Sequence, residues 1–145
     1  MGTNTLLLSA STTPVPDLIA IGATPSNDGI VNIPGTAGTG LFATAAVNIG
    51  AAATITASAD DGGAGLPVNL SICQTNPSTG QCTNPATPGP SATVAVANNQ
   101  TVTFTVFAKG AGTVPFDPAN NRLFLRLKDA GALTRGATGA AVRTQ

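Results

Sequence analysis

Two segments near the end of the chain alternate apolar and polar residues with a period of two. In TVTFTVFAK, residues 101–109, the apolar positions are Val102, Phe104 and Val106. In RLFLRLKD, residues 122–129, every second position is a leucine. A period of two is the side-chain period of a β-strand, so each segment has one face for a core and one for solvent or a partner. A turn-rich connection, residues 110–121, joins these two predicted strands.

The rest of the chain is typical of an all-β protein. The strong helix formers Glu, Lys, Gln and Met are scarce or absent, whereas Thr, Ala, Gly, Ser and Pro are abundant. Short apolar segments separated by turn residues recur about every ten residues, which predicts an antiparallel β-sandwich of about 7–9 strands. Residues 83–90 (TNPATPGP) contain too much proline for a strand. The strands are expected in the segments 17–24, 30–33, 41–50, 52–60, 66–72, 91–98, 101–109, 122–129 and 134–144.

The length of 145 residues fits one domain, expected at residues 17–145, preceded by an arm or linker at residues 1–16. Val, Leu, Ile and Phe together make up 33 residues, enough for a core. From the inward phase of the clearest strands, we expect the core to include Val47, Ile55, Leu70, Val102, Phe104, Leu123 and Leu125.

Cys73 and Cys82 enclose eight residues that are rich in turn formers. We interpret them as a disulfide that closes a hairpin, which is typical of an extracellular or cell-surface protein. The apolar triplet 6–8 is too short for a signal peptide, and no segment is long and apolar enough to cross a membrane. The chain is therefore expected to be a fragment of an exported protein whose signal peptide lies elsewhere.

Charge is sparse and balanced, with six basic and six acidic residues, so no footprint for nucleic acid or for an anionic membrane is present. All six cations lie in the last 37 residues, whereas four of the six aspartates precede them. Outward charge that keeps strands soluble explains this distribution. An alternative is contact between the acidic and basic ends of neighbouring modules or subunits.

The residue types exclude most enzyme classes. The chain has no His, Glu or Tyr, so it offers neither a usual general base nor a catalytic constellation, and no cofactor is expected. A calcium site built on Asp60 and Asp61 is the weak metal candidate, but no ladder of acidic residues surrounds them, and aspartate before glycine is usual turn chemistry. We therefore expect no catalytic residue and no metal.

One strand face offers candidate partner-binding residues. The polar phase of RLFLRLKD carries an aromatic ring among cations: Arg122, Phe124, Arg126 and Lys128. Such a face suits an anionic glycan or a protein partner. The alternative is that a loop or the terminal segment partly covers this face.

The chain resembles the immunoglobulin-like modules of bacterial secreted and surface proteins in the order of its strands and in two short motifs, Val47-Asn48-Ile49-Gly50 and Thr101-Val102-Thr103-Phe104. The resemblance spans about residues 17–144 and implies an immunoglobulin-like sandwich, export and an adhesion-related setting. It transfers no catalytic or ligand residue. The chain departs from antibody-type domains, because both cysteines lie in one loop and there is no tryptophan.

The function expected from the sequence is a non-enzymatic structural or adhesive module of a larger exported bacterial surface protein. One alternative is a glycan- or protein-binding module that uses the face around Phe124. Another is a self-assembling fibre subunit, in which Thr3–Ser9 of the arm adds a strand to an exposed sheet edge of a neighbour.

Overall fold

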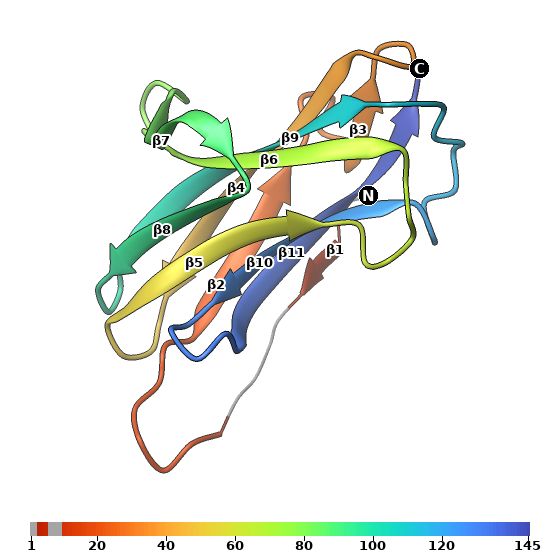
Figure 1. The fold of residues 1–145 in the computed structure, drawn as a ribbon. Coiled ribbons are helices and arrows are strands. Elements are labelled where there is room, and N and C mark those ends of the chain that lie inside the picture. Colours follow the sequence, from red (N-terminus) through yellow and green to blue (C-terminus); the bar gives the residue numbers. More distant parts are fainter. Residues whose placement is uncertain (1–2, 6–9) are drawn as a thin grey trace.

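A computed structural model describes residues 3–5 and 10–145 and shows a sandwich of two β-sheets (Figure 1). The described residues contain no helix of a length and apolarity that would span a lipid bilayer. Within them lie eleven strands: β1 (Thr3–Thr5), β2 (Leu18–Ala23), β3 (Ile30–Ile33), β4 (Thr39–Asn48), β5 (Ala53–Asp60), β6 (Val68–Thr75), β7 (Cys82–Gly89), β8 (Ser91–Val96), β9 (Thr101–Gly110), β10 (Arg122–Lys128) and β11 (Thr134–Thr144).

The strands form a six-stranded and a five-stranded sheet. The first, sheet A, has the order β1-β11-β10-β5-β8, with β3 also on β11; the second, sheet B, has the order β2-β4-β9-β6-β7. All pairs are antiparallel except β3 with β11, which is parallel. The all-β sandwich expected from the sequence is confirmed. The two strands beyond the expected nine are β1 and β7.

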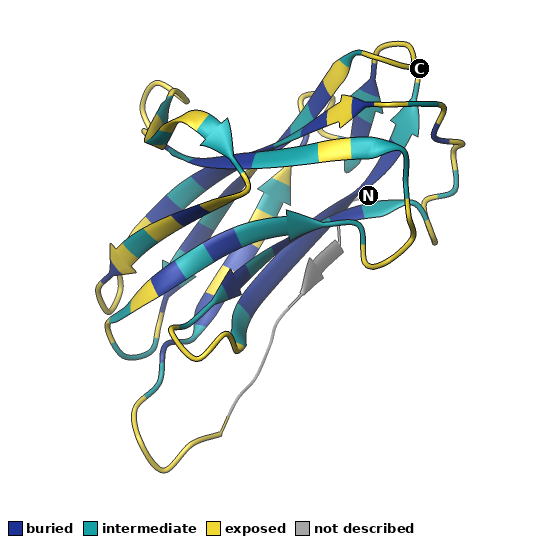
Figure 2. Cartoon of the chain, viewed as in Figure 1, coloured by how far each residue is buried: buried dark blue, intermediate teal, exposed yellow. Residues whose placement is uncertain are grey.

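Alternating side chains from both sheets form one hydrophobic core. Figure 2 shows the buried residues as dark blue bands on the strands. Of the seven expected core residues, Ile55, Val102, Phe104, Leu123 and Leu125 are buried. The largest fully buried side chains are Phe42, Phe104, Leu18, Ile33, Ile55, Ile72, Leu123, Leu125 and Leu127.

The other two expected core residues differ. Leu70 is only partly buried, although it packs against the core. Val47 was assigned to the wrong phase: Phe42, Ala46 and Asn48 point inward from β4, so Val47 lies on the outer face. The reason is that β4 carries apolar residues on both phases, and alternation alone could not choose between them.

The expectation that residues 83–90 form no strand is wrong. Residues 83–89 belong to β7, which pairs with β6 and is an edge strand of sheet B. Prolines are tolerated at such an edge because one side of the strand needs no donors.

The expected N-terminal arm, residues 1–16, includes a short strand near its start. Residues 3–5 form β1 and pair with β11 of the same chain, in the register Thr3↔Gly139 to Thr5↔Ala137. Residues 1, 2 and 6–9, including the apolar triplet 6–8, lie outside the described residues.

Candidate functional site

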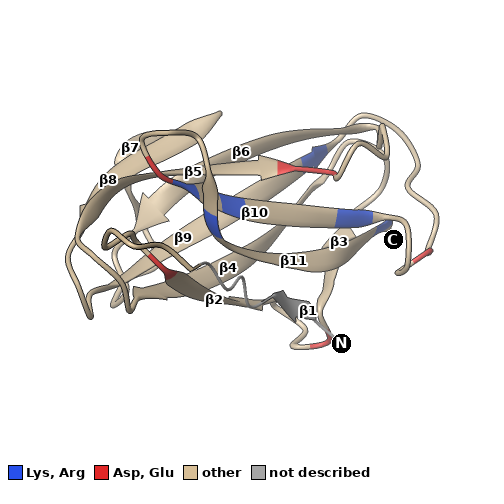
Figure 3. Cartoon of the chain, turned by 90° about the horizontal axis from the view of Figure 1, so that it is seen from below, with Lys and Arg blue, Asp and Glu red and all other residues tan. Residues whose placement is uncertain are grey.

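The four predicted partner-binding residues share the outer face of β10. Arg122, Phe124, Arg126 and Lys128 alternate with leucines that are fully buried, so the predicted phase of this strand is right. Basic residues along β10 are visible in Figure 3. Strand β5 lies beside β10 in sheet A and places Asp60 opposite Phe124.

Arg126 and Asp60 form a two-pronged ion pair. Nε of Arg126 donates to Oδ2 of Asp60 at 2.5 Å, and Nη2 donates to Oδ1 at 3.1 Å. Burial raises the pKa of Asp60, but the hydrogen bonds from Arg126 and from the Gly62 amide more than offset it, so the pKa lies below its ordinary value. The charge of Arg126 is therefore paired with a carboxylate of the same chain.

Phe124 is half-buried beneath its neighbours. The guanidinium carbon of Arg126 lies 5.0 Å from the ring centroid. A Cβ atom added to Gly62 would lie 2.9 Å from the ring, and one added to Gly139 would lie 3.0 Å from it. The ring therefore occupies space that these two glycines leave free. Arg122 donates from Nη1 to the Pro118 carbonyl at 3.0 Å.

The two aspartates of the calcium hypothesis shape a turn. Asp61 accepts the Gly63 amide on Oδ1 at 3.0 Å and the Leu66 amide on Oδ2 at 2.8 Å. These bonds, above all the one from Leu66, lower the pKa of Asp61. Among residues 3–5 and 10–145, no group of three or more His, Cys, Asp or Glu side chains is arranged to hold a metal ion.

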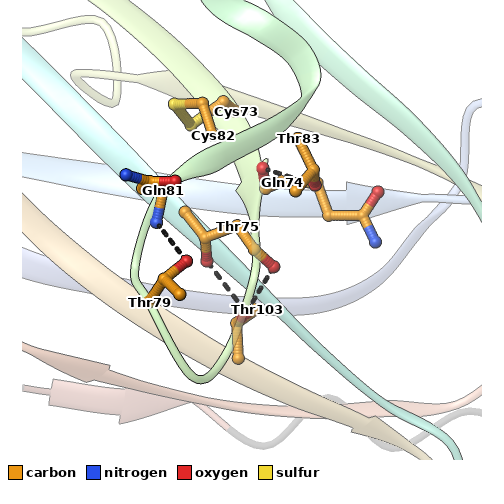
Figure 4. The surroundings of a disulfide bond; sticks show 8 residues. All are labelled: Cys73, Gln74, Thr75, Thr79, Gln81, Cys82, Thr83 and Thr103. Carbon is orange, nitrogen blue, oxygen red and sulfur yellow. Dashed lines mark hydrogen bonds between the residues drawn. A yellow bond between two sulfur atoms is a disulfide. The ribbon is translucent and has the colours of Figure 1, made fainter.

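Cys73 and Cys82 form the expected disulfide, with their Cα atoms 5.5 Å apart (Figure 4). The bond ties β6 to β7 where their register shifts. Nearby, Thr75 and Thr103 join β6 to β9 by a hydroxyl–hydroxyl bond of 2.8 Å, and the Thr103 hydroxyl also donates to the Thr75 carbonyl. The stapled hairpin is therefore anchored to the body of sheet B.

The turn of this hairpin borders a shallow apolar hollow of about 270 Å³ on the outer face of sheet B. Its floor includes Ile21, Ala43 and Ala45, and its rim includes Thr75 and Pro77. Strands β2 and β4 contain no charged residue. The residues that line the hollow include no charged side chain. They are mostly small and form no motif, so the sequence gave no signal for it.

Asn48 is a structural residue that the sequence analysis did not single out for a role. It is fully buried, and its Oδ1 accepts the amides of Asp17 at 3.1 Å and Gly50 at 3.0 Å. Its Nδ2 donates to the Ala51 carbonyl at 2.8 Å. One amide side chain therefore fastens the entry to β2 to the β4–β5 turn.

The pairing of β3 with β11, which we call the terminal seam, links an early strand to the last strand of the domain. Its register runs from Ala141↔Ile30 to Thr144↔Ile33. The Ala141 amide donates to the Gly29 carbonyl at 3.0 Å, and the Gln145 amide donates to the Ile33 carbonyl at 2.8 Å. Backbone bonds therefore extend along the whole seam.

Side chains reinforce the terminal seam on both faces. Val31, Ile33 and Val142 are fully buried on the core side. On the outer face, Nε of Arg143 donates to Oδ1 of Asn32 at 2.7 Å, and its guanidinium carbon lies 5.2 Å from the Phe116 ring centroid. The seam thus combines continuous backbone pairing, core burial and one cross-strand side-chain bond.

No family model matches the chain, and no curated protein matches it. The fold resembles the CARDB domain of the PF1109 protein from Pyrococcus furiosus, solved in complex with di-metal ions, at 10% identity and a TM-score of 0.44 over 94% of this chain and 100% of that one. It also resembles a DUF4466 family protein from Parabacteroides merdae ATCC 43184, at 16% identity and a TM-score of 0.39 over 88% of this chain and 44% of that one. The similarities are too distant to assign a family or a site.

Proposed function

We propose that this chain is a non-enzymatic structural or adhesive module of a larger exported surface protein, and that it resists forces applied between its two ends. The observation that carries the proposal is the parallel pairing of β3 with β11. The disulfide supports export, since such bonds persist in oxidising compartments.

The direction of the strands explains the mechanical role. In a module of a longer chain, tension enters ahead of β1 and leaves after β11. Once β1 has left β11 and β2 has left β4, the pull acts on β3 at its first residue, Ile30, and on β11 at its last, Thr144. Because the two strands are parallel, this pull slides one along the other and loads the seam's hydrogen bonds together. An antiparallel hairpin pulled at its open end would instead lose its bonds one after another.

Single-molecule force measurements on the full chain, held at both ends, test this proposal. Ala141→Pro removes the amide that donates to Gly29 in the seam. We expect a clear drop in unfolding force, because forced unfolding reports the barrier along the pulled direction. Asn32→Ala is the milder variant, since it removes only the bond from Arg143; it should lower the force less.

Thr93→Pro on β8 is the matched control. Strand β8 is an edge of sheet A, and the Thr93 carbonyl accepts Nδ2 of Asn84 on the side away from β5. The Thr93 amide points to that same side, so proline there breaks no ladder bond. The substitution does remove the exposed hydroxyl bond between Thr93 and Thr56, at 3.0 Å, but this bond lies outside the seam, so Thr93→Pro should leave the force unchanged. Equal effects of the two proline substitutions, or no effect of either, would contradict the proposal.

A further inference from the structure

Two strands, β1 and β3, pair with the outer edge of β11. Peptide groups alternate sides along a strand. The Val142 amide donates to Asn121, next to β10, whereas the Ala141 amide donates to Gly29, next to β3. The peptide groups of Ala137 and Gly139 therefore face the outer edge as well.

This part of the edge is covered in the fold. With β1 in place, Ala137 is 8% exposed and Gly139 is buried, and buried peptide groups are almost always hydrogen-bonded. Strand β3 covers β11 only from Ala141 onward. The neighbouring stretch, Ala137–Gly139, is paired instead with the three residues of β1.

Strand β1 is joined to the body of the domain by a single segment of chain. The chain is next fixed at Val15, whose carbonyl accepts the Ala51 amide at 2.9 Å, and at Asp17, whose carbonyl accepts the Ile49 amide at 2.8 Å. Residues 6–14 lie between these anchors and β1. Nine residues span at most about 30 Å, which sets the greatest distance from Val15 at which β1 could pair.

We infer that the Ala137–Gly139 edge of β11 is a strand-acceptor site, and that its exchangeable ligand is residues 3–5 of a second copy of this chain. The backbone bonds are the same whether the strand comes from its own chain or from another. The balance is therefore set by protein concentration against the effective concentration of the tethered strand, which is on the order of millimolar for a short link. The inference depends on the β1–β11 register and not on the proposed mechanical role, so either can fail without the other.

Cysteine cross-linking between two full-length variants tests the exchange. One chain carries Thr5→Cys and the other Ala137→Cys, because these positions are directly opposite each other in the register. The two are mixed and oxidised at rising concentration, toward about 1 mM. A chain carrying both substitutions reports pairing within one molecule. Thr101→Cys, exposed on sheet B, replaces Ala137→Cys in the control mixture.

We expect a mixed dimer of twice the 14.1 kDa chain mass, increasing with concentration, with the new link mapped by mass spectrometry between positions 5 and 137 and Cys73–Cys82 intact. The double variant should close within one chain at low concentration. The inference is overturned if the mixture gives no more dimer than the Thr101→Cys control. It is equally overturned if the double variant does not link positions 5 and 137, because β1 would then not occupy this edge.

Discussion

The terminal seam and the β6–β7 hairpin hold strands together by opposite means. In the seam, four consecutive residue pairs keep an unbroken register, and the core side is fully buried. In the hairpin, the register shifts twice and the turn is exposed, and a disulfide closes the gap. The covalent bond thus lies where the non-covalent pairing is irregular.

This difference separates local from global stability. Cys73 and Cys82 are nine positions apart in sequence, so their bond restricts one short loop. The seam joins residues that are more than a hundred positions apart. Reinforcing the hairpin should therefore protect the hairpin, whereas the seam, together with the core beneath it, ties distant parts of the domain together.

The largest effect is expected from a substitution in the core that the seam and the hairpin share. Phe104 lies between the sheets on β9, which pairs with β4 and β6. Phe104→Ala should lower the free energy of unfolding by about 3–5 kcal/mol, measured by urea denaturation. Phe107→Ala, on the outer face of the same strand, is the control and should cost less. A loss below about 1 kcal/mol for Phe104→Ala would mean that the seam and the hairpin do not share one core.

Removing the Cys73–Cys82 disulfide tests the part of the comparison that concerns the hairpin. The double variant Cys73→Ala/Cys82→Ala should lose about 2–3 kcal/mol through the greater freedom of the unfolded chain. Calorimetry with and without reductant should show a lower melting temperature but a folded domain, since the seam and core remain. Complete unfolding on reduction would show instead that the hairpin holds the sandwich together.

The smallest expected effect concerns charge. The pKa of Asp60 is lowered in the folded state, so its contribution to stability is present above its unfolded pKa of about 4 and is lost as the pH falls through the native value. Both partners of the Asp60–Arg126 pair are at least one-third exposed, so the contribution should stay below about 1 kcal/mol.

Denaturation at pH 7 and at pH 3 should show that Asp60→Asn reduces the acid-induced loss of stability. Some loss should remain, because the pKa values of Asp28, Asp61, Asp117 and Asp129 are also lowered. Asn32→Ala in the seam removes a bond without an ionisable acceptor, so it should leave the shape of the pH profile unchanged. An unaltered acid profile for Asp60→Asn would contradict the role given to the ion pair.

Local sequence patterns predicted the parts of the fold that depend on local chemistry. Alternation gave the right faces for β9 and β10, and the turn formers between Cys73 and Cys82 indicated the stapled hairpin. Alternation gave the wrong face for Val47, because β4 is apolar on both phases. Strand β7 was not predicted, because its prolines argued against a strand.

Long-range pairing left no comparable signal. The shared face of Arg122, Phe124, Arg126 and Lys128 followed from spacing on one strand, but the Asp60 partner required the β5–β10 register. Likewise, nothing near Ile30 indicates that it lies beside Ala141. The composition of β11 also gave little sign of its burial, because its glycines and alanines form only a weak apolar pattern. These small residues are buried because neighbouring strands approach closely.

Native-state hydrogen exchange at the Ala141 amide tests most directly whether the terminal seam opens only with the whole domain. This amide donates to the Gly29 carbonyl, and the Asn76 amide in the hairpin turn, which donates to the Gln81 carbonyl at 2.9 Å, is the comparison. Amides that open only with the whole domain exchange with the global free energy of unfolding, whereas local openings cost less. We predict the global value for Ala141 and a smaller value for Asn76. Exchange of Ala141 with a free energy as low as that of Asn76 would show that the seam opens locally and would contradict its role in joining the ends.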